Sequence, residues 1–304
     1  MSERAVDVIA PRIATEAEVV LPPISAGLMR HLLRQPRFLI PAFGVFVACV
    51  MAAVPQLFAG LFGHGDPNAC DLANSGLGPM PGHPFGFDIQ GCDLYSNVIY
   101  GARASMSIGL LSTAAILVIA ILLGSVAGYS GGIADSIIGR LMDIFFGFPA
   151  LVGMIVFLET FNTHTALSVS LVLALFMWPA ATRVMRGSVL ATAHLDFVTA
   201  SRSIGAGYLR ILARHVIPNS IGPVAVLGSL SIGGVIAAEA ALTFLGVGLR
   251  APSISWGVQL NTAQQYFEIH PNLLIFPGLF LSLTILSFVL IGDTLRDALD
   301  PKLR

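Results

Sequence analysis

Few residues of this chain have types and spacing that could support chemistry, and the first to consider is a serine between glycines. The run Gly128-Tyr-Ser130-Gly-Gly132 matches the Gly-x-Ser-x-Gly pattern of a hydrolase nucleophile. That pattern needs a strand immediately before the serine, whereas a long apolar segment of helical type precedes Ser130. We therefore interpret these residues as a glycine-rich turn between two apolar segments, and we predict no catalytic residue here.

The distribution of lysine, histidine and cysteine excludes several other kinds of site. Lys302 is the only lysine, so a phosphate-binding Gly-x-x-x-x-Gly-Lys-Ser/Thr loop cannot be formed by this sequence. The seven histidines and three cysteines show no metal-ligand spacing. We predict a chain that is not an enzyme and that holds no metal and no cofactor. Any ATP-driven work, with its ATP and magnesium, must be supplied by another polypeptide.

The composition indicates a protein of the lipid bilayer. Hydrophobic residues make up 55% of the chain and charged residues 11%, whereas soluble domains contain about 25% charged residues. The mean hydropathy is +0.83. Apolar segments of about 20 residues can cross a hydrocarbon core, where backbone groups must be paired within a helix. We predict an all-α integral membrane protein with six spans, at about 38–62, 106–128, 141–160, 165–185, 221–245 and 272–292.

The positions of arginine and lysine predict the orientation. Of the 16 basic residues, 14 fall in the N-terminal tail, at Arg140, in the loop after the fourth span or in the C-terminal tail. Only Arg103 and Arg250 fall in the other loops. Basic residues concentrate on the cytosolic side of membrane proteins. We therefore expect both termini in the cytosol, a cytosolic tail with an interfacial helix at 1–37, a six-span domain at 38–304, and an outer loop at 63–105.

A polar stretch of about 40 residues separates the fourth and fifth spans and is too long for a tight turn. Phe197, Ala200 and Ile204 recur at helical spacing, and we expect Asp196 to cap the N-terminus of this first short helix. Gly205 should end that helix, and Pro218 should end a second one. The stretch is predicted to be a docking surface on the cytosolic side, or else a plain interfacial loop.

The spacing Gly205, nine residues, then His-Val-Ile-Pro218 resembles the signature loop of bacterial ABC importer permeases. In that family the loop is usually written Glu-Ala-Ala, three residues, Gly, nine residues, Ile, one residue, Leu-Pro. Further resemblance to the dipeptide/oligopeptide permeases, and to their C-type subunit, covers roughly residues 80 to 304. It is carried by Tyr100-Gly-Ala-Arg-Ala-Ser, Gly128-Tyr-Ser-Gly-Gly, Phe148-Pro, Glu239-Ala-Ala-Leu-Thr-Phe-Leu-Gly-Val-Gly, Ser255-Trp-Gly and the ending Gly292-Asp-Thr-Leu-Arg-Asp-Ala-Leu-Asp-Pro-Lys-Leu-Arg.

The resemblance implies a type I ABC importer permease that forms half of a translocation path for di- or oligopeptides. It implies a homologous B-type permease, two ATPase subunits or domains, an extracytoplasmic peptide-binding protein and a peptide substrate as partners, in a bacterial cell membrane. Residues 186–220, called the coupling loop below, would seat a short helix in a groove of the ATPase. The coupling residues expected are Asp196, Phe197, Thr199, Ala200, Ser201, Arg202, Ile204, Gly205 and Pro218.

Two departures from the family pattern affect these expectations. Thr199 stands where the signature has Glu, so an ionic contact common in the family is missing. Cys92 stands where the family usually has Arg, and Cys70 lies in the same outer loop. These two cysteines would form a disulfide that stabilises the fold by roughly 3 kcal/mol, or remain two free thiols.

Glu239 is a carboxyl group in the fifth span, about six residues from its outer end. An ionised side chain near the bilayer centre costs roughly 2.5–3.5 kcal/mol, so Glu239 should face the bundle interior or an aqueous path. We expect it either to form a structural hydrogen bond between helices or to serve in the translocation path or its gating.

Three other functions compete with a peptide importer permease. Related systems carry nickel, sugars or other solutes on the same scaffold. An intramembrane enzyme is disfavoured because the sequence shows no acid–base pair or metal set. An ion-driven secondary transporter would normally carry more charged residues at mid-membrane than Glu239 alone.

Overall fold

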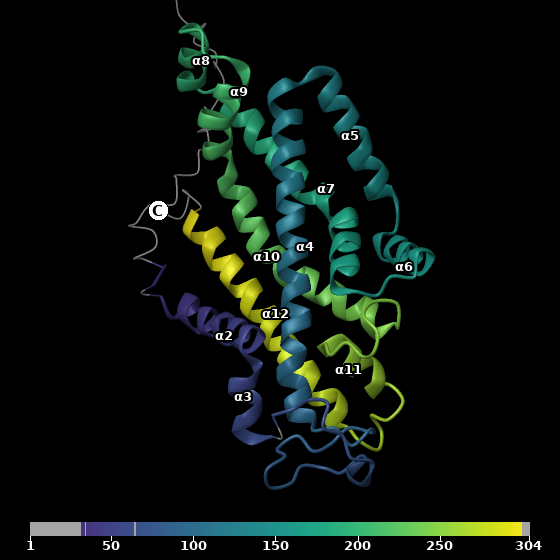
Figure 1. Ribbon diagram of the computed structural model, residues 1–304. Helices are drawn as coiled ribbons and strands as arrows, with labels where there is room; N and C mark the ends of the chain where they lie inside the picture. The colour runs from purple at the N-terminus through teal and green to yellow at the C-terminus, as the bar shows by residue number, and fades with distance from the viewer. Residues whose placement is uncertain (1–31, 34, 64, 300–304) are drawn as a thin grey trace, which may run out of the picture.

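The computed structural model describes residues 32–33, 35–63 and 65–299 (Figure 1). Among these residues every regular element is a helix, apart from three isolated bridges in the loop that precedes α4. The N-terminal tail, most of the expected interfacial helix and Lys302 lie outside the described residues.

Five helices are long and apolar enough to cross a membrane. They are α2 (Pro36–Ala53), α4 (Leu94–Ser130), α7 (Ala166–Ala193), the continuous helical segment Tyr208–Phe244 that includes α10 (Ile217–Phe244), and α12 (Asn272–Leu299). The pair α5 (Gly132–Gly147) and α6 (Ala150–Phe161) makes a sixth candidate if the two count as one span. The predicted all-α class is confirmed, with five or six candidate spans among the described residues.

Two of the predicted spans are interrupted, each at a proline. The range 141–160 falls on a bend of 89° between α5 and α6, so it is not one straight helix. Phe148, which precedes Pro149, has φ −98° and ψ 134°, because the proline ring excludes the helical conformation of the residue before it. The range 38–62 is likewise divided at Val54, before Pro55, where α3 (Pro55–Phe62) begins.

Helix α4 is the central element of the bundle, and it packs most extensively against α7 (Figure 1). Gly124 and Gly128 allow this close approach. A Cβ atom on Gly124 would lie 2.7 Å from Met185 Cβ, and one on Gly128 would lie 2.7 Å from the Arg186 carbonyl oxygen. Small residues at four-residue spacing let two helices approach closely, as they do here.

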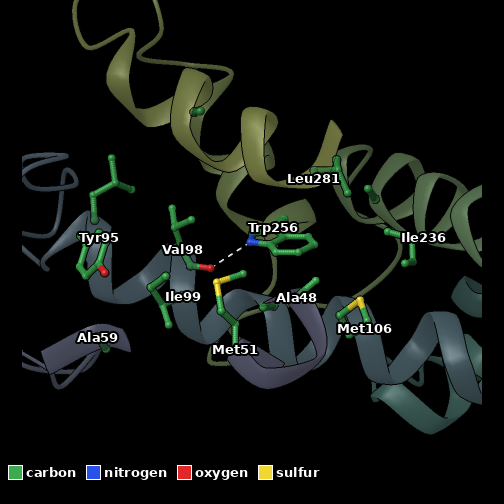
Figure 2. Packing of buried hydrophobic residues seen from close by; sticks show 14 of the residues in the cluster. Ala48, Met51, Ala59, Tyr95, Val98, Ile99, Met106, Ile236, Trp256 and Leu281 are labelled. Carbon is green, nitrogen blue, oxygen red and sulfur yellow. Dashed lines mark hydrogen bonds between the residues drawn. The ribbon is translucent and has the colours of Figure 1, made fainter. Parts of the chain in front are cut away.

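A second region of tight packing surrounds Trp256, the first residue of the short helix α11 (Trp256–Ala263). The indole is fully buried and donates a hydrogen bond of 2.9 Å to the Val98 carbonyl of α4 (Figure 2). Side chains from α2, α4, α10 and α12 enclose it, so this ring joins four of the long helices. The labelled members from those helices are Ala48, Met51, Val98, Ile99, Met106, Ile236 and Leu281 (Figure 2).

The two ends of the bundle have different structures (Figure 1). At one end, the loop between α3 and α4 folds back beside α11 and α12. Its Phe85 ring stacks on Phe276 of α12 with 3.8 Å between ring centroids. At the other end, the short helix α8 (Asp196–Ser203) lies beyond the end of the long helices, and α9 (Tyr208–Ile211) lies beside the end of α4. These belong to the coupling loop.

Candidate coupling loop

Helix α8 forms close to the position predicted, but its N-cap is a different residue. Leu195 is the N-cap, with extended backbone and no side-chain hydrogen bond, and Asp196 is the first helical residue. The prediction of an Asp196 cap is therefore wrong. The Asp196 carboxylate still lies in the first turn, where negative charge interacts favourably with the helix dipole.

The end of α8 is defined by Gly205, as predicted. Gly205 has φ +80°, a conformation that glycine adopts without steric cost. Its N–H donates to the Arg202 carbonyl at 2.9 Å, and the Ala206 N–H donates to the Ser201 carbonyl at 3.1 Å. This pair of hydrogen bonds is the Schellman motif, which satisfies the last carbonyl groups of a helix. The turn after α8 is thus fixed by backbone geometry.

The second helix of the coupling loop does not end at Pro218, and that prediction is wrong. Helix α9 continues through a π-helical turn, Leu212–Val216, directly into α10, and Pro218 occupies the first turn of α10. A proline has no N–H to donate to the preceding turn. A local π turn accommodates this missing bond without breaking the helix.

The faces of α8 and α9 separate two buried residues, Val198 and Ile211, from several exposed apolar ones. Val198 is fully buried against Met185 and other apolar side chains of α7, α9 and the π turn. Sequence reasoning missed Val198, because its burial depends on α8 folding back on α7. Ile204 is 84% exposed and Leu209 is 75% exposed, and Phe197 is also exposed. The loop therefore presents apolar surface away from the rest of the chain.

Three small residues and one arginine complete the exposed side of α8. Thr199, Ala200 and Arg202 are exposed, and Ser201 is half-buried. The Ser201 hydroxyl donates to the Phe197 carbonyl at 2.7 Å, so it is satisfied within the helix. This leaves a surface of small side chains that another chain could approach closely. All the predicted coupling residues from Asp196 to Gly205 lie on α8 or its C-terminal turn, whereas Pro218 lies apart from them in α10.

The coupling loop also contacts the end of α4, which the sequence did not predict. The hydroxyl groups of Ser130 and Tyr208 are 2.6 Å apart, and the rings of Tyr129 and Tyr208 have centroids 4.9 Å apart. The Arg202 guanidinium carbon lies 5.3 Å from the centroid of the Tyr129 ring. Ser130 and Tyr208 are 78 residues apart in sequence, so only the tertiary fold brings them together. The predicted glycine-rich turn follows Ser130, with φ +63° at Gly131.

Two ion pairs join α5 to α7 near the same end of the bundle. The Asp135 carboxylate accepts hydrogen bonds from Arg186 Nε at 2.5 Å and from a terminal nitrogen of Arg186 at 2.7 Å. Asp143 and Arg183 form a longer pair at 3.4 Å between exposed side chains. The bidentate geometry at Arg186 makes the first pair the more specific of the two.

Glu239 is fully buried in the interior of the bundle. Its Oε1 accepts a hydrogen bond of 2.9 Å from the Thr243 hydroxyl, which in turn accepts the Leu249 N–H at 3.1 Å. The Ser105 hydroxyl of α4 lies beside the same carboxyl group, but no hydrogen bond of normal geometry joins them. Glu239 Oε2 has no hydrogen-bond partner among the described residues.

At the opposite end from the coupling loop, Cys70 and Cys92 have their sulfur atoms 2.02 Å apart. They help to line a pocket of about 520 Å³ between the loop that precedes α4 and helix α11. Asp88 also lines it and accepts backbone hydrogen bonds from Gln90 and Cys92, each at 2.8 Å. Partial burial raises the pKa of the Asp88 carboxyl above its ordinary value, against the opposing effect of these hydrogen bonds. In the described part of the chain, no group of three or more metal-ligating side chains could hold a metal ion.

Comparison with known proteins places this architecture in a family. Residues 120–304 match the model of the "Binding-protein-dependent transport system inner membrane component" family. The chain is 37% identical over 275 residues to the glutathione transport system permease protein GsiD of Pectobacterium atrosepticum, covering 90% of each chain. It is 33% identical to the oligopeptide transport system permease protein OppC of Bacillus subtilis, covering 85% of this chain and 84% of that one.

A dipeptide transport system permease protein, DppC of Bacillus subtilis, is 36% identical over 77% of this chain and 73% of its own length. Among solved structures, the crystal structure of an amino acid ABC transporter with histidines matches with a TM-score of 0.50 at 14% identity, over 65% of this chain and 92% of that one. That likeness concerns the fold alone. The chain therefore belongs to the family of binding-protein-dependent transport system inner membrane components, the permease subunits of ABC importers.

Proposed function

We propose that this chain is one of two permease subunits of an ATP-driven importer for di- and oligopeptides, including small peptides such as glutathione. The proposal is supported by relatives whose names specify glutathione, oligopeptide and dipeptide transport. The observation that carries it is the coupling loop, whose Ile204 and Leu209 are exposed apolar side chains at one end of the bundle. Such a surface is suited to a protein partner.

The partners proposed are a homologous B-type permease, two ATPase subunits or domains, and an extracytoplasmic peptide-binding protein. The energy must come from the ATPase partners, because this sequence has one lysine, Lys302, and no phosphate-binding loop. In this arrangement the coupling loop and both termini face the cytosol of a bacterial cell, as the distribution of arginines favours. The loop between α3 and α4 then faces outward.

The mechanism proposed is mechanical and involves no covalent chemistry in this chain. The external binding protein delivers peptide to a cavity between the two permeases. ATP binding draws the ATPase pair together and displaces helix α8, which lies in a groove of the ATPase. Because the Gly205 turn is fixed by hydrogen bonds, α8 moves as a rigid body and displaces the ends of α7 and α10. The cavity then changes the side of the membrane that it faces.

Reconstitution tests the proposed function directly. The chain would be copurified with its B-type permease and ATPases, inserted into proteoliposomes, and supplied with the binding protein. Uptake of radiolabelled glutathione, alanyl-alanine and pentaalanine would be measured with and without ATP. ATP-dependent uptake of at least one peptide is the expected result. Uptake of only a non-peptide solute such as nickel or a sugar, or uptake driven by an ion gradient without ATP, would refute the proposal.

Accessibility labelling tests the orientation. A single cysteine introduced as Thr199→Cys, in a chain with Cys49→Ser, Cys70→Ser and Cys92→Ser, would be probed with a membrane-impermeant maleimide. Thr199 is exposed, so the reagent should reach it from the cytosolic side of inverted vesicles and not from outside intact cells. Labelling from outside intact cells would exclude a role of the coupling loop in ATPase binding.

A further inference from the structure

The coupling loop is joined to the central helix α4 by a contact that the peptide chain itself does not provide. Along the chain, the loop connects only α7 and α10. The contact with α4 consists of the Ser130–Tyr208 hydrogen bond of 2.6 Å and the packing of the Tyr129 and Tyr208 rings at 4.9 Å. The Arg202 side chain of α8 also joins this contact, because its guanidinium carbon lies 5.3 Å from the centroid of the Tyr129 ring. Both short helices of the loop therefore contribute to it.

The part of α4 that is contacted is its last turn, which leads directly into α5. Gly131 and Gly132 follow Ser130 with φ +63° and +55°, so the chain reverses here through two residues in conformations that favour glycine. Just beyond the reversal, Asp135 forms its bidentate ion pair with Arg186 of α7. The α4–α5 turn is thus held from two directions, by Tyr208 of the coupling loop and by Arg186 of α7.

This arrangement determines which helices a moving coupling loop would displace. A force on α8 reaches α7 and α10 through the backbone. It can reach α4 and α5 only through side chains, and Tyr208 is the residue whose hydroxyl and ring both make that connection. A hydroxyl–hydroxyl bond and a ring contact are directional, so they transmit displacement in a way that general apolar contact does not.

We infer that Tyr208 and Ser130 are positioning residues that pass the displacement of the coupling loop to the α4–α5 turn, so that α4 and α5 move together with α7 and α10 during transport. The inference rests on the proposed function. It assigns a role to Ser130 that is mechanical, in a motif whose spacing otherwise suggests a nucleophile. Loss of the connection should leave a complex that assembles and hydrolyses ATP with fewer peptides taken up for each ATP.

The test uses the reconstituted complex with three variants, Tyr208→Phe, Ser130→Ala and both together. Each single change removes only the hydroxyl–hydroxyl bond and keeps the Tyr129 ring contact. Tyr95→Phe is the matched control, because the Tyr95 hydroxyl donates to the Phe58 carbonyl at 2.9 Å at the opposite end of the bundle. The readouts are the yield of assembled complex and the number of alanyl-alanine molecules, or of the best transported peptide of the panel, taken up per ATP hydrolysed.

Each single variant should lower the ratio of uptake to ATP hydrolysis by about two- to tenfold, the range that a single hydrogen bond can contribute. The double variant should resemble the single ones, because all three lack the same bond. The yield of complex should be unchanged, and Tyr95→Phe should keep the ratio of the unmodified protein.

Three outcomes would overturn the inference. The ratio could remain normal in Tyr208→Phe and Ser130→Ala, their effects could add, or the yield of complex could fall in proportion to uptake, as expected of a merely structural contact.

Gly205→Val distinguishes a failure of this inference from a failure of the proposed function. If Gly205→Val stops uptake while Tyr208→Phe and Ser130→Ala behave normally, only the role proposed for Tyr208 and Ser130 is wrong. If Gly205→Val transports normally, the coupling role of the loop itself is wrong.

Discussion

The two ends of this helical bundle differ in how far their apolar side chains are buried. At the end near α11, a fully buried Trp256 is hydrogen-bonded to the Val98 carbonyl, and four long helices enclose it. At the coupling-loop end, α8 buries only Val198, while Ile204 and Leu209 are exposed. At the first end, side chains of this chain bury the apolar residues. At the second end, apolar side chains stay exposed and can contact another molecule. Substitutions at the first end should therefore reduce stability, and substitutions at the second should reduce transport.

The largest loss of stability is expected from Trp256→Ala. A Trp→Ala change in a core costs about 3–5 kcal/mol, because the lost burial and the cavity both contribute. Here the change also removes the hydrogen bond that the Trp256 indole N–H donates to the Val98 carbonyl. Thermal unfolding of the detergent-solubilised protein should show a large decrease in midpoint, and Trp256→Phe should show a smaller one. An unchanged midpoint for Trp256→Ala would remove the distinction between the two ends.

The next effect concerns the loop before α4, where we predict that Cys70 and Cys92 form a disulfide. The closed loop has a sequence separation of 22, for which a bridge contributes roughly 3 kcal/mol. Thiol counting in denaturant should find one thiol, Cys49, without reductant and all three cysteines with it. Cys70→Ser with Cys92→Ser should lower the unfolding midpoint. Three reactive thiols in the untreated protein would disprove the bridge.

A smaller effect is expected at Glu239, and here two variants sharpen the comparison. Glu239→Gln keeps an oxygen that can accept the Thr243 hydroxyl bond, so its stability should be close to that of the unmodified protein. Glu239→Leu leaves that hydroxyl without its acceptor and should cost about 1–3 kcal/mol.

Uptake measured on the same two variants decides the role of Glu239. A Glu239→Gln complex that assembles normally and transports peptide slowly would assign the carboxyl group to the translocation path or its gating. Normal uptake by Glu239→Gln would assign it a structural role alone.

The smallest change in stability is expected from Gly205→Val, although it should abolish uptake. A residue with a side chain at φ +80° is strained by roughly 1–2 kcal/mol, and the Schellman turn that orients α8 should be lost. Membrane insertion should be normal, because no atom lies within 4 Å of the position of an added Cβ.

Gly207→Val is the matched control for Gly205→Val. Gly207 lies in the same loop, has φ −69° and extended backbone, and also has open space around its Cβ position. It should retain transport. Equal loss of uptake in both variants would show that the loop tolerates no added side chain, independently of the backbone conformation at Gly205.

Much of the helix content followed from the sequence because lipid leaves the backbone few choices. A long apolar segment without charges must pair its backbone groups internally, so its length and composition predict a helix. The same is true of Gly205, since a glycine at the end of a short helical pattern predicts a left-handed turn. Gly124 and Gly128 favour a close helix contact for a similar local reason, because four-residue spacing puts two small residues on one face.

Other features were decided only by tertiary structure. The burial of Val198, the Ser130–Tyr208 bond and the ion pair of Asp135 with Arg186 all join residues far apart in sequence, and no local pattern marks such pairs. The path through Pro218 was also not predictable, because a π turn can absorb the missing hydrogen bond of a proline or the helix can end there.

The sequence by itself determined most of the helical segments, the turn at Gly205 and the lack of a phosphate-binding loop in the residues given, because these depend on local composition and spacing. The tertiary structure alone decided which side chains fix the coupling loop to the bundle and which remain exposed. The physical reason is that helices in a bundle meet through side chains whose partners are set by packing angle and depth, and a one-dimensional pattern contains neither.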